Sequence, residues 1–112
     1  MELEITRELT RSFKWACETG NKELVRILLK DGRVDPALRC RIPDFPLITS
    51  CTFGRTDIVK MLLEDGRVNP DAVGPDGTLN FQIKISCQQG YTEIVKLLLK
   101  DSRVVNVLTS LV

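Results

Sequence analysis

Apolar residues recur along the chain at helical spacing, and the same arrangement appears three times. In each copy, two adjacent apolar residues are followed four positions later by a second adjacent pair. These positions are Leu24, Val25, Leu28 and Leu29, then Ile58, Val59, Leu62 and Leu63, and then Ile94, Val95, Leu98 and Leu99. Pairs at this spacing cover one face of a helix, so the pattern predicts three amphipathic helices that each bury one side.

Another helix is predicted before each of these, within the same repeated unit. Cys17, Cys51 and Cys87 occupy one equivalent position, with offsets of 34 and 36 residues between them. A glycine follows three residues after each cysteine, and glycine ends a helix at little cost because it readily adopts left-handed backbone. These glycines are Gly20, Gly54 and Gly90. Each unit is therefore predicted to be a helix, a tight turn and a second helix.

Local signals mark both ends of the second helices. Short polar side chains that can accept hydrogen bonds from the first helical N–H groups are the predicted caps, at Asn21, Thr56 and Thr92. An Asp-Gly-Arg-Val run followed by Pro36 or Pro70 is predicted to end the first two helices, because proline disfavours helix in the residue before it. Residues 37–44 and 71–80 are then predicted to be loops or hairpins.

The repeated unit resembles the ankyrin repeat. Ala16, Cys17 and Gly20, followed by Leu24-Val25 and Leu28-Leu29, are similar to the family's A-A-x-x-G-x-x-x-V-V-x-x-L-L core, and the offsets approach its period of about 33 residues. The resemblance implies an all-α ankyrin-repeat solenoid of stacked helix-turn-helix units with hairpin loops, and a role in binding other proteins. The implied organisation is a single domain, 1–112, with repeats at about 10–36, 44–70 and 80–105, an N-terminal cap at 1–9 and an apolar C-terminal tail at 105–112.

The chain departs from the family at the start of each first helix. The family's T-P-L-H motif is replaced by Arg11-Ser12-Phe13-Lys14, Phe45-Pro46-Leu47-Ile48 and Phe81-Gln82-Ile83-Lys84. In the family, the threonine and histidine of this motif tie neighbouring repeats by hydrogen bonds. We therefore expect the repeats of this chain to lack those ties.

Composition removes several classes of function. With 16 Lys and Arg against 15 Asp and Glu in 112 residues, the net charge is +1, so no strong field recruits nucleic acid or a membrane surface. The absence of His removes Ser-His-Asp and Cys-His catalysis and the commonest metal ligand. We expect no enzyme activity, no metal and no cofactor. No secretion signal or membrane span is evident, so we expect an intracellular, cytoplasmic protein, and a nuclear location is compatible with the sequence.

The cysteines are expected to be structural. Equivalent positions in neighbouring repeats lie about 8–10 Å apart, too far for three thiols to share a zinc ion or for two to form a disulfide. Cys17, Cys51 and Cys87 replace an alanine of the family pattern, and we expect each to pack in the core as a small apolar side chain. Cys40 lies in a predicted loop and is expected to be an exposed but poorly nucleophilic thiol.

Arginines recur two residues after an aspartate in every unit. They are Arg33, Arg67 and Arg103. A row of basic side chains could bind phosphate or an acidic peptide. Because the net charge is near zero and aromatic partners are absent, the favoured interpretation is a solvated row paired locally with Asp31, Asp65 and Asp101.

Side chains that the repeat leaves variable are the candidates for binding a partner protein. In ankyrin-like geometry, the ends of the first helices and the hairpin tips line the concave face. The predicted contact residues are Glu18, Thr19, Arg41, Ile42, Asp44, Thr52, Phe53, Asp76, Thr78, Asn80, Gln88 and Gln89. Phe53 is either a binding contact or a filler against the next hairpin. For Trp15, core packing is favoured over a role as an exposed contact.

The two ends of the array differ in polarity. Residues 2–19, if largely helical, place Leu3, Ile5, Leu9 and Phe13 near one side and charged residues elsewhere, which provides a polar cap. At the other end, residues 104–112 are largely apolar. They either fold back over the last repeat, bury against another copy of the chain, or belong to a longer array. Self-association through residues 104–112, as a structural or assembly subunit, is therefore the alternative to concave-face binding.

Overall fold

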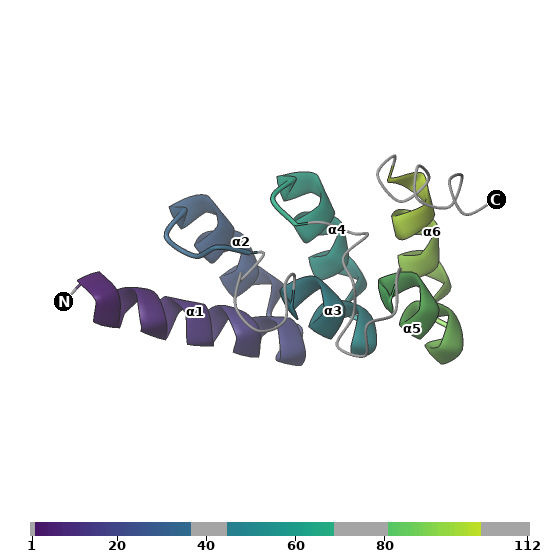
Figure 1. Ribbon diagram of the computed structural model, residues 1–112, viewed down its shortest axis with the longest axis horizontal. Helices are drawn as coiled ribbons and strands as arrows, with labels where there is room; N and C mark the ends of the chain where they lie inside the picture. Colours follow the sequence, from purple (N-terminus) through teal and green to yellow (C-terminus); the bar gives the residue numbers. More distant parts are fainter. Residues whose placement is uncertain (1, 37–44, 69–80, 102–112) are drawn as a thin grey trace.

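The fold is a row of helix pairs, seen in a computed structural model that describes residues 2–36, 45–68 and 81–101 (Figure 1). Within these residues the chain forms six α-helices and no strand. The helices are α1 (Glu2–Thr19), α2 (Lys22–Asp31), α3 (Phe45–Thr52), α4 (Thr56–Asp65), α5 (Phe81–Gln89) and α6 (Thr92–Lys100). The predicted all-α architecture of stacked helix-turn-helix units is confirmed.

The helices form two layers. The first helices of the pairs, α1, α3 and α5, lie side by side in one layer, and α2, α4 and α6 lie in the other (Figure 1). We call these the inner and outer helices. The two helices of each pair pack together, and neighbouring repeats pack through the helices of the same layer, α1 with α3 with α5 and α2 with α4 with α6. α1 is continuous over its whole length, so residues 2–9 of the predicted cap form the first half of an inner helix.

Glycines end the helices at two places in each of the first two repeats. Gly20 adopts a left-handed φ of 82°, and its N–H donates to the Ala16 oxygen at 2.9 Å. Gly54 and Gly90 repeat this conformation, as predicted. The outer helices α2 and α4 end at Gly32 and Gly66, which are also left-handed. The helix ends predicted at the Asp-Gly-Arg-Val runs are confirmed, and the glycine of each run stops the helix before the proline is reached, because left-handed backbone cannot continue a right-handed helix.

The cap prediction is confirmed for α2 and wrong for α4 and α6. Asn21 Oδ1 accepts from the Leu24 N–H at 3.2 Å. Thr56 and Thr92 are instead the first residues of their helices. The cap positions there belong to Arg55 and Tyr91, neither of which makes a side-chain cap hydrogen bond. The residue directly after the turn glycine is the cap in every repeat, so Asn21 is equivalent to Arg55 and Tyr91.

The core is built from apolar, mostly aliphatic side chains of both layers and runs through all three repeats. Its fully buried members include Phe13, Val25, Leu47, Ile58, Leu62, Ile94 and Leu98. None of the described helices combines the length and the apolar character that a bilayer span requires.

Two sequence predictions about the core are corrected by the structure. Cys17 and Cys51 are buried as predicted, but Cys87 is exposed. The cause is the stacking order: α3 covers α1 and α5 covers α3, but no described helix packs on the far side of α5. Trp15 is 56% exposed rather than packed in the core, because α1 belongs to the first repeat and no described helix precedes it in the stack.

Candidate functional site

The candidate contact residues that the structure describes lie at the C-terminal ends of the inner helices. Five are exposed, Glu18, Thr19, Phe53, Gln88 and Gln89, and Thr52 is half-buried. We call these six residues the inner-helix face. The other predicted contacts, Arg41, Ile42, Asp44, Asp76, Thr78 and Asn80, lie outside the described residues, as do Cys40, Arg103 and residues 104–112.

Phe53 is the large apolar side chain of the inner-helix face. Its side chain is 52% exposed, although the residue follows the buried end of α3. Its N–H donates to the Thr49 oxygen at 3.0 Å, and the neighbouring Thr52 hydroxyl donates to the Ile48 oxygen at 2.8 Å. These bonds hold the backbone of the α3 end while the Phe53 ring faces solvent. The next hairpin, against which Phe53 would act as a filler, lies outside the described residues, so the choice between the two alternatives stays a prediction.

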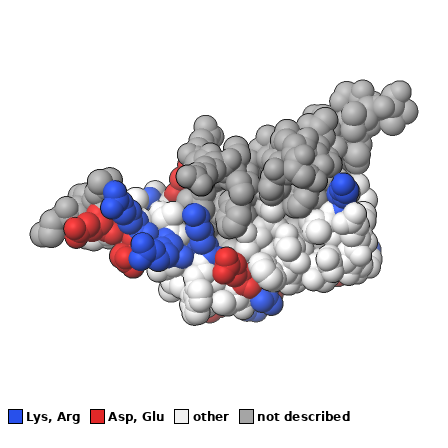
Figure 2. Space-filling model, turned by 60° about the horizontal axis from the view of Figure 1, so that its bottom comes forward, with Lys and Arg blue, Asp and Glu red and all other residues white. Residues whose placement is uncertain are grey.

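Charge is distributed unevenly over the inner layer. Figure 2 shows charged side chains gathered at the α1 end and a largely uncharged surface beyond it. α3 contains no charged residue and α5 contains only Lys84, whereas α1 carries Arg7, Arg11 and Lys14 together with four glutamates. Part of the α1 charge is paired, since Arg11 contacts Glu8 at 3.1 Å. The layer of inner helices therefore runs from a charged end at α1 to a largely uncharged region at α3 and α5.

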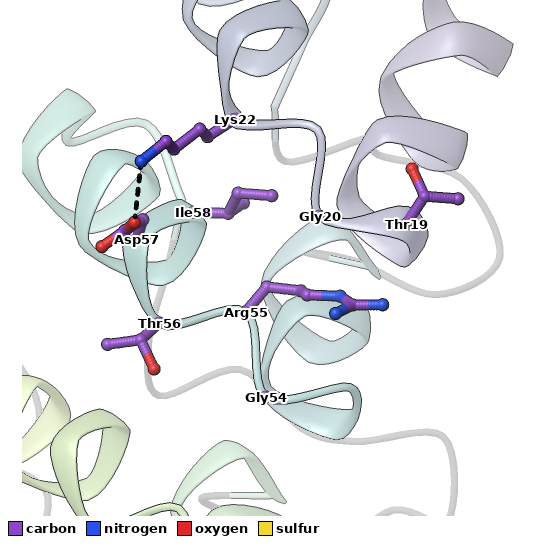
Figure 3. A pocket seen from close by; sticks show the side chains of 8 residues that line it. All are labelled: Thr19, Gly20, Lys22, Gly54, Arg55, Thr56, Asp57 and Ile58. Atoms are coloured by element: carbon purple, nitrogen blue, oxygen red, sulfur yellow. Dashed lines mark hydrogen bonds and ion pairs between the residues drawn. The ribbon is translucent and has the colours of Figure 1, made fainter.

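A hollow of about 320 Å³ lies where the turns of the first two repeats meet (Figure 3). Its lining residues are Thr19, Gly20, Lys22, Gly54, Arg55, Thr56, Asp57 and Ile58. Lys22 Nζ lies 3.4 Å from Asp57 Oδ2, which links α2 to α4 across the hollow. The Arg55 guanidinium crosses the same junction and donates from Nε and Nη2 to the main-chain oxygen of Glu18, at 3.0 and 2.7 Å. The hollow is thus a junction between repeats, and its charged groups already have protein partners.

The next junction has an equivalent tie. The Tyr91 hydroxyl donates to the main-chain oxygen of Thr52 at 3.4 Å. Tyr91 holds the same position in repeat three that Arg55 holds in repeat two. A Cβ added at Gly20 would lie 3.2 Å from Arg55 Cδ, and one added at Gly54 would lie 2.8 Å from Tyr91 Cζ. Both turn glycines therefore leave room for the side chain that reaches back from the next repeat.

These ties were not predicted from the sequence, which suggested only that the family's Thr and His links are missing. The available signal was the residue after each turn glycine, which changes from Asn21 to the much longer Arg55 and Tyr91. A cap side chain must accept from the first N–H groups, which the donor-only Arg55 guanidinium cannot do, and neither Arg55 nor Tyr91 makes a cap hydrogen bond. Both side chains instead donate to the preceding repeat.

Arg33 and Arg67, the repeated arginines that the structure describes, pair locally within their loops as predicted. Arg33 Nε and Arg67 Nε each lie 2.6 Å from a carboxylate oxygen, of Asp31 and Asp65 respectively. The hydrogen bonds from these guanidinium groups lower the pKa of both aspartates. Arg67 also donates to the main-chain oxygens of Leu29 at 3.2 Å and Val34 at 3.4 Å, in the preceding repeat. Arg67 is therefore a further inter-repeat tie, which the sequence interpretation missed.

The described residues offer little reactive chemistry. They contain no group of three His, Cys, Asp or Glu side chains placed to hold a metal ion. Burial raises the pKa of the Cys17 thiol to about 11 and that of Cys51 to about 12. The nearby Ser86 hydroxyl lowers the pKa of Cys51, but by less than burial raises it. Both thiols are therefore protonated at neutral pH and poor nucleophiles.

Comparison with known proteins agrees with the fold. The sequence matches the family described as ankyrin repeats, in three copies, over residues 13–109. This match runs from the C-terminal part of α1 through α6. Among curated proteins, none matches the chain.

Proposed function

Because the chain belongs to the ankyrin repeat family, we propose that it binds another protein through the inner-helix face and performs no covalent chemistry. Ankyrin repeats are generally protein-interaction modules. The observation that supports this face is the exposed ring of Phe53, on the helix layer with the fewest charges. Aromatic side chains at the centre of a contact commonly carry much of its binding energy.

The chemistry of the inner-helix face indicates the kind of partner surface it fits. Phe53 requires an apolar pocket, and the amides of Gln88 and Gln89 can donate and accept hydrogen bonds beside it. Towards α1, the face becomes charged, with Glu18 exposed at its edge. The matching surface is an apolar patch with polar groups at its rim. The ties made by Arg55, Arg67 and Tyr91 favour this arrangement, because a rigid stack loses little conformational freedom on binding.

The test compares the proteins captured from a cell lysate by the natural chain and by Phe53→Glu. Lys60→Glu is the matched control, because Lys60 is also exposed but lies on the outer helix α4 of the same repeat. We expect a captured protein that is lost with Phe53→Glu and retained with Lys60→Glu. Equal capture by all three proteins contradicts binding through this face.

A second candidate function is self-association through the C-terminal end of the stack, as an assembly subunit. The observation that favours it is exposure of two residues of the third repeat, Cys87 and Leu99, whose counterparts in earlier repeats are at least half-buried. A mass that rises with protein concentration is the expected result. A constant monomer mass contradicts it.

A further inference from the structure

The contacts between outer helices follow a rule that repeats along the stack. Leu63 of α4 and Leu97 of α6 line the same hollow between these two helices. One repeat earlier, the equivalent residues are Leu29 of α2 and Met61 of α4, on helices that also pack together. All four side chains are half-buried and pack against the core. An apolar side chain of each outer helix thus faces an apolar side chain of the preceding repeat.

The inner helices follow a matching rule. Cys17 and Cys51 are fully buried, each beneath the helix of the following repeat, and a serine of that helix, Ser50 or Ser86, approaches each thiol. Thr49 is only 5% exposed, and α3 packs against α1 as well as against α5. Thr49 is two positions from Cys51, so at 3.6 residues per turn it points to the opposite side of α3, towards α1. Each inner helix therefore also has one position that meets the preceding repeat and one that meets the following repeat.

Applied to the two ends of the described stack, these rules identify four positions whose counterparts lie inside the stack. At the first repeat, Trp15 is equivalent to Thr49, and Ile27 is equivalent to Met61. Trp15 is 56% exposed and Ile27 is 61% exposed. We call these two residues the N-terminal end face. They lie five residues before and seven residues after Gly20, so they are at similar height on the two helices of the pair.

At the third repeat, Cys87 is equivalent to Cys51, and Leu99 is equivalent to Leu63. Cys87 is exposed, and Leu99 is 43% exposed. We call these two residues the C-terminal end face. The two end faces are complementary, because one carries the position that meets a preceding repeat and the other the position that meets a following repeat. All four side chains are apolar or weakly polar, and the larger pair stands on the N-terminal face.

We infer that the N-terminal end face of one copy of this chain binds the C-terminal end face of a second copy, so that the copies stack head to tail. The inference rests on the second candidate function and adds the surface that receives the C-terminal end. The contact would continue an interface that the chain already forms twice, between α2 and α4 and between α4 and α6. Such a contact joins two different surfaces, so each added copy leaves an end face for the next and growth is open-ended.

The junction between copies differs from the internal junctions in one respect. Asn21, at the position of Arg55 and Tyr91, caps its own helix and does not reach back across the junction. The contact between copies therefore lacks the hydrogen bond that ties each internal junction. Because of this loss, we expect the contact between copies to be weaker than an internal junction, so that association depends on concentration over an accessible range.

The experiment uses two variants of the full chain, Ile27→Glu and Leu99→Glu, which each place a charge on one end face. Ile27 is 61% and Leu99 43% exposed, so we expect the folded repeat to tolerate both changes, and circular dichroism checks this. Sedimentation equilibrium then gives the mass over a wide concentration range. We expect the natural chain to grow in mass with concentration and each variant alone to remain a monomer.

The decisive sample is an equal mixture of the two variants. Ile27→Glu keeps an intact C-terminal end face, and Leu99→Glu keeps an intact N-terminal end face. The mixture is therefore expected to form a two-chain species and nothing larger, because the remaining ends are blocked. Lys60→Gln, which makes the same charge change on the exposed surface of the middle repeat, is expected to associate like the natural chain.

Each other outcome has a defined meaning. A natural chain that stays monomeric at every concentration overturns both head-to-tail stacking and self-association. Association that is lost with Leu99→Glu but kept with both Ile27→Glu and Trp15→Glu overturns head-to-tail stacking and leaves self-association through the C-terminal end. A mixture of variants that stays monomeric also overturns the head-to-tail contact. None of these outcomes bears on partner binding through the inner-helix face.

Discussion

Arg55 donates two hydrogen bonds to the main-chain oxygen of Glu18, across the junction between the first and second repeats. This oxygen lies in the last turn of α1, where helix carbonyls have no partner within their own helix. A charged donor from the next repeat therefore satisfies a helix end and holds two repeats together. Tyr91 makes the same kind of contact to Thr52 one repeat later.

Arg55→Ala tests the tie between the first two repeats. The substitution removes two hydrogen bonds to one partly solvated oxygen, so we expect the free energy of unfolding to fall by about 1 kcal/mol. Arg26→Ala is the control, because among the described residues the ion-pair partner of Arg26 is Glu23 of its own helix, an exposed contact worth about a few tenths of a kcal/mol. Urea denaturation of both variants measures the difference. Equal losses would show that Arg55 does not link the repeats.

Gly54→Ala and Gly90→Ala separate backbone strain from close packing. Both glycines are left-handed, with φ of 71° and 75°, so alanine costs about 1–2 kcal/mol at either position. Only at Gly54 does the new Cβ meet the Tyr91 ring, at 2.8 Å, whereas nothing lies within 4 Å at Gly90. We expect the larger loss of stability for Gly54→Ala. In a Tyr91→Ala background this excess is expected to disappear, and its persistence would contradict the role of the ring.

Gln82→Met is expected to stabilise the protein. Gln82 is fully buried, and both polar atoms of its side-chain amide lack a hydrogen-bond partner. Methionine has a similar length and no buried polar group to desolvate, so the gain is about 1–2 kcal/mol. Thermal and urea denaturation measure it, with Gln88→Met, at an exposed position, as the control expected to change little. A loss of stability would mean that the Gln82 amide makes a contact that methionine cannot replace.

Thiol labelling is expected to distinguish Cys87 from its two counterparts. Burial protects Cys17 and Cys51 and raises their pKa values to about 11 and about 12, so both react slowly at neutral pH. In a Cys40→Ser background, one thiol of the folded protein should react rapidly with an aromatic disulfide reagent, and all three should react in denaturant. Rapid labelling of Cys17 or Cys51 in the folded protein would contradict the burial of these side chains.

Much of the fold was predictable because its determinants are local. The spacing of Leu24, Val25, Leu28 and Leu29 defines a buried helix face, and a glycine such as Gly20 ends a helix by its own backbone preference. These features depend on neighbouring residues, so the repeated pattern reveals them. The confirmed packing of helix pairs follows from the same pattern.

The predictions that were wrong concern residues whose surroundings are set by contacts between repeats. The exposure of Cys87 and Trp15 is set by which repeat lies beside each residue, and a pattern that treats the repeats as equal does not contain that information. The cap positions were misassigned because Thr56 is a good capping residue by type, whereas Arg55 occupies the cap position by geometry. Of the predicted contact residues, six lie on described helix ends, and their role in binding stays a prediction.

The most direct test of the proposed function places a photo-cross-linking amino acid at position 53 and, separately, at position 60 of the full chain. Both positions are exposed and belong to the same repeat, but only position 53 lies on the inner-helix face. After illumination in a cell lysate, binding through this face predicts a covalent adduct with a different protein from position 53 and none from position 60. No adduct at position 53, or the same adducts from both positions, would contradict it.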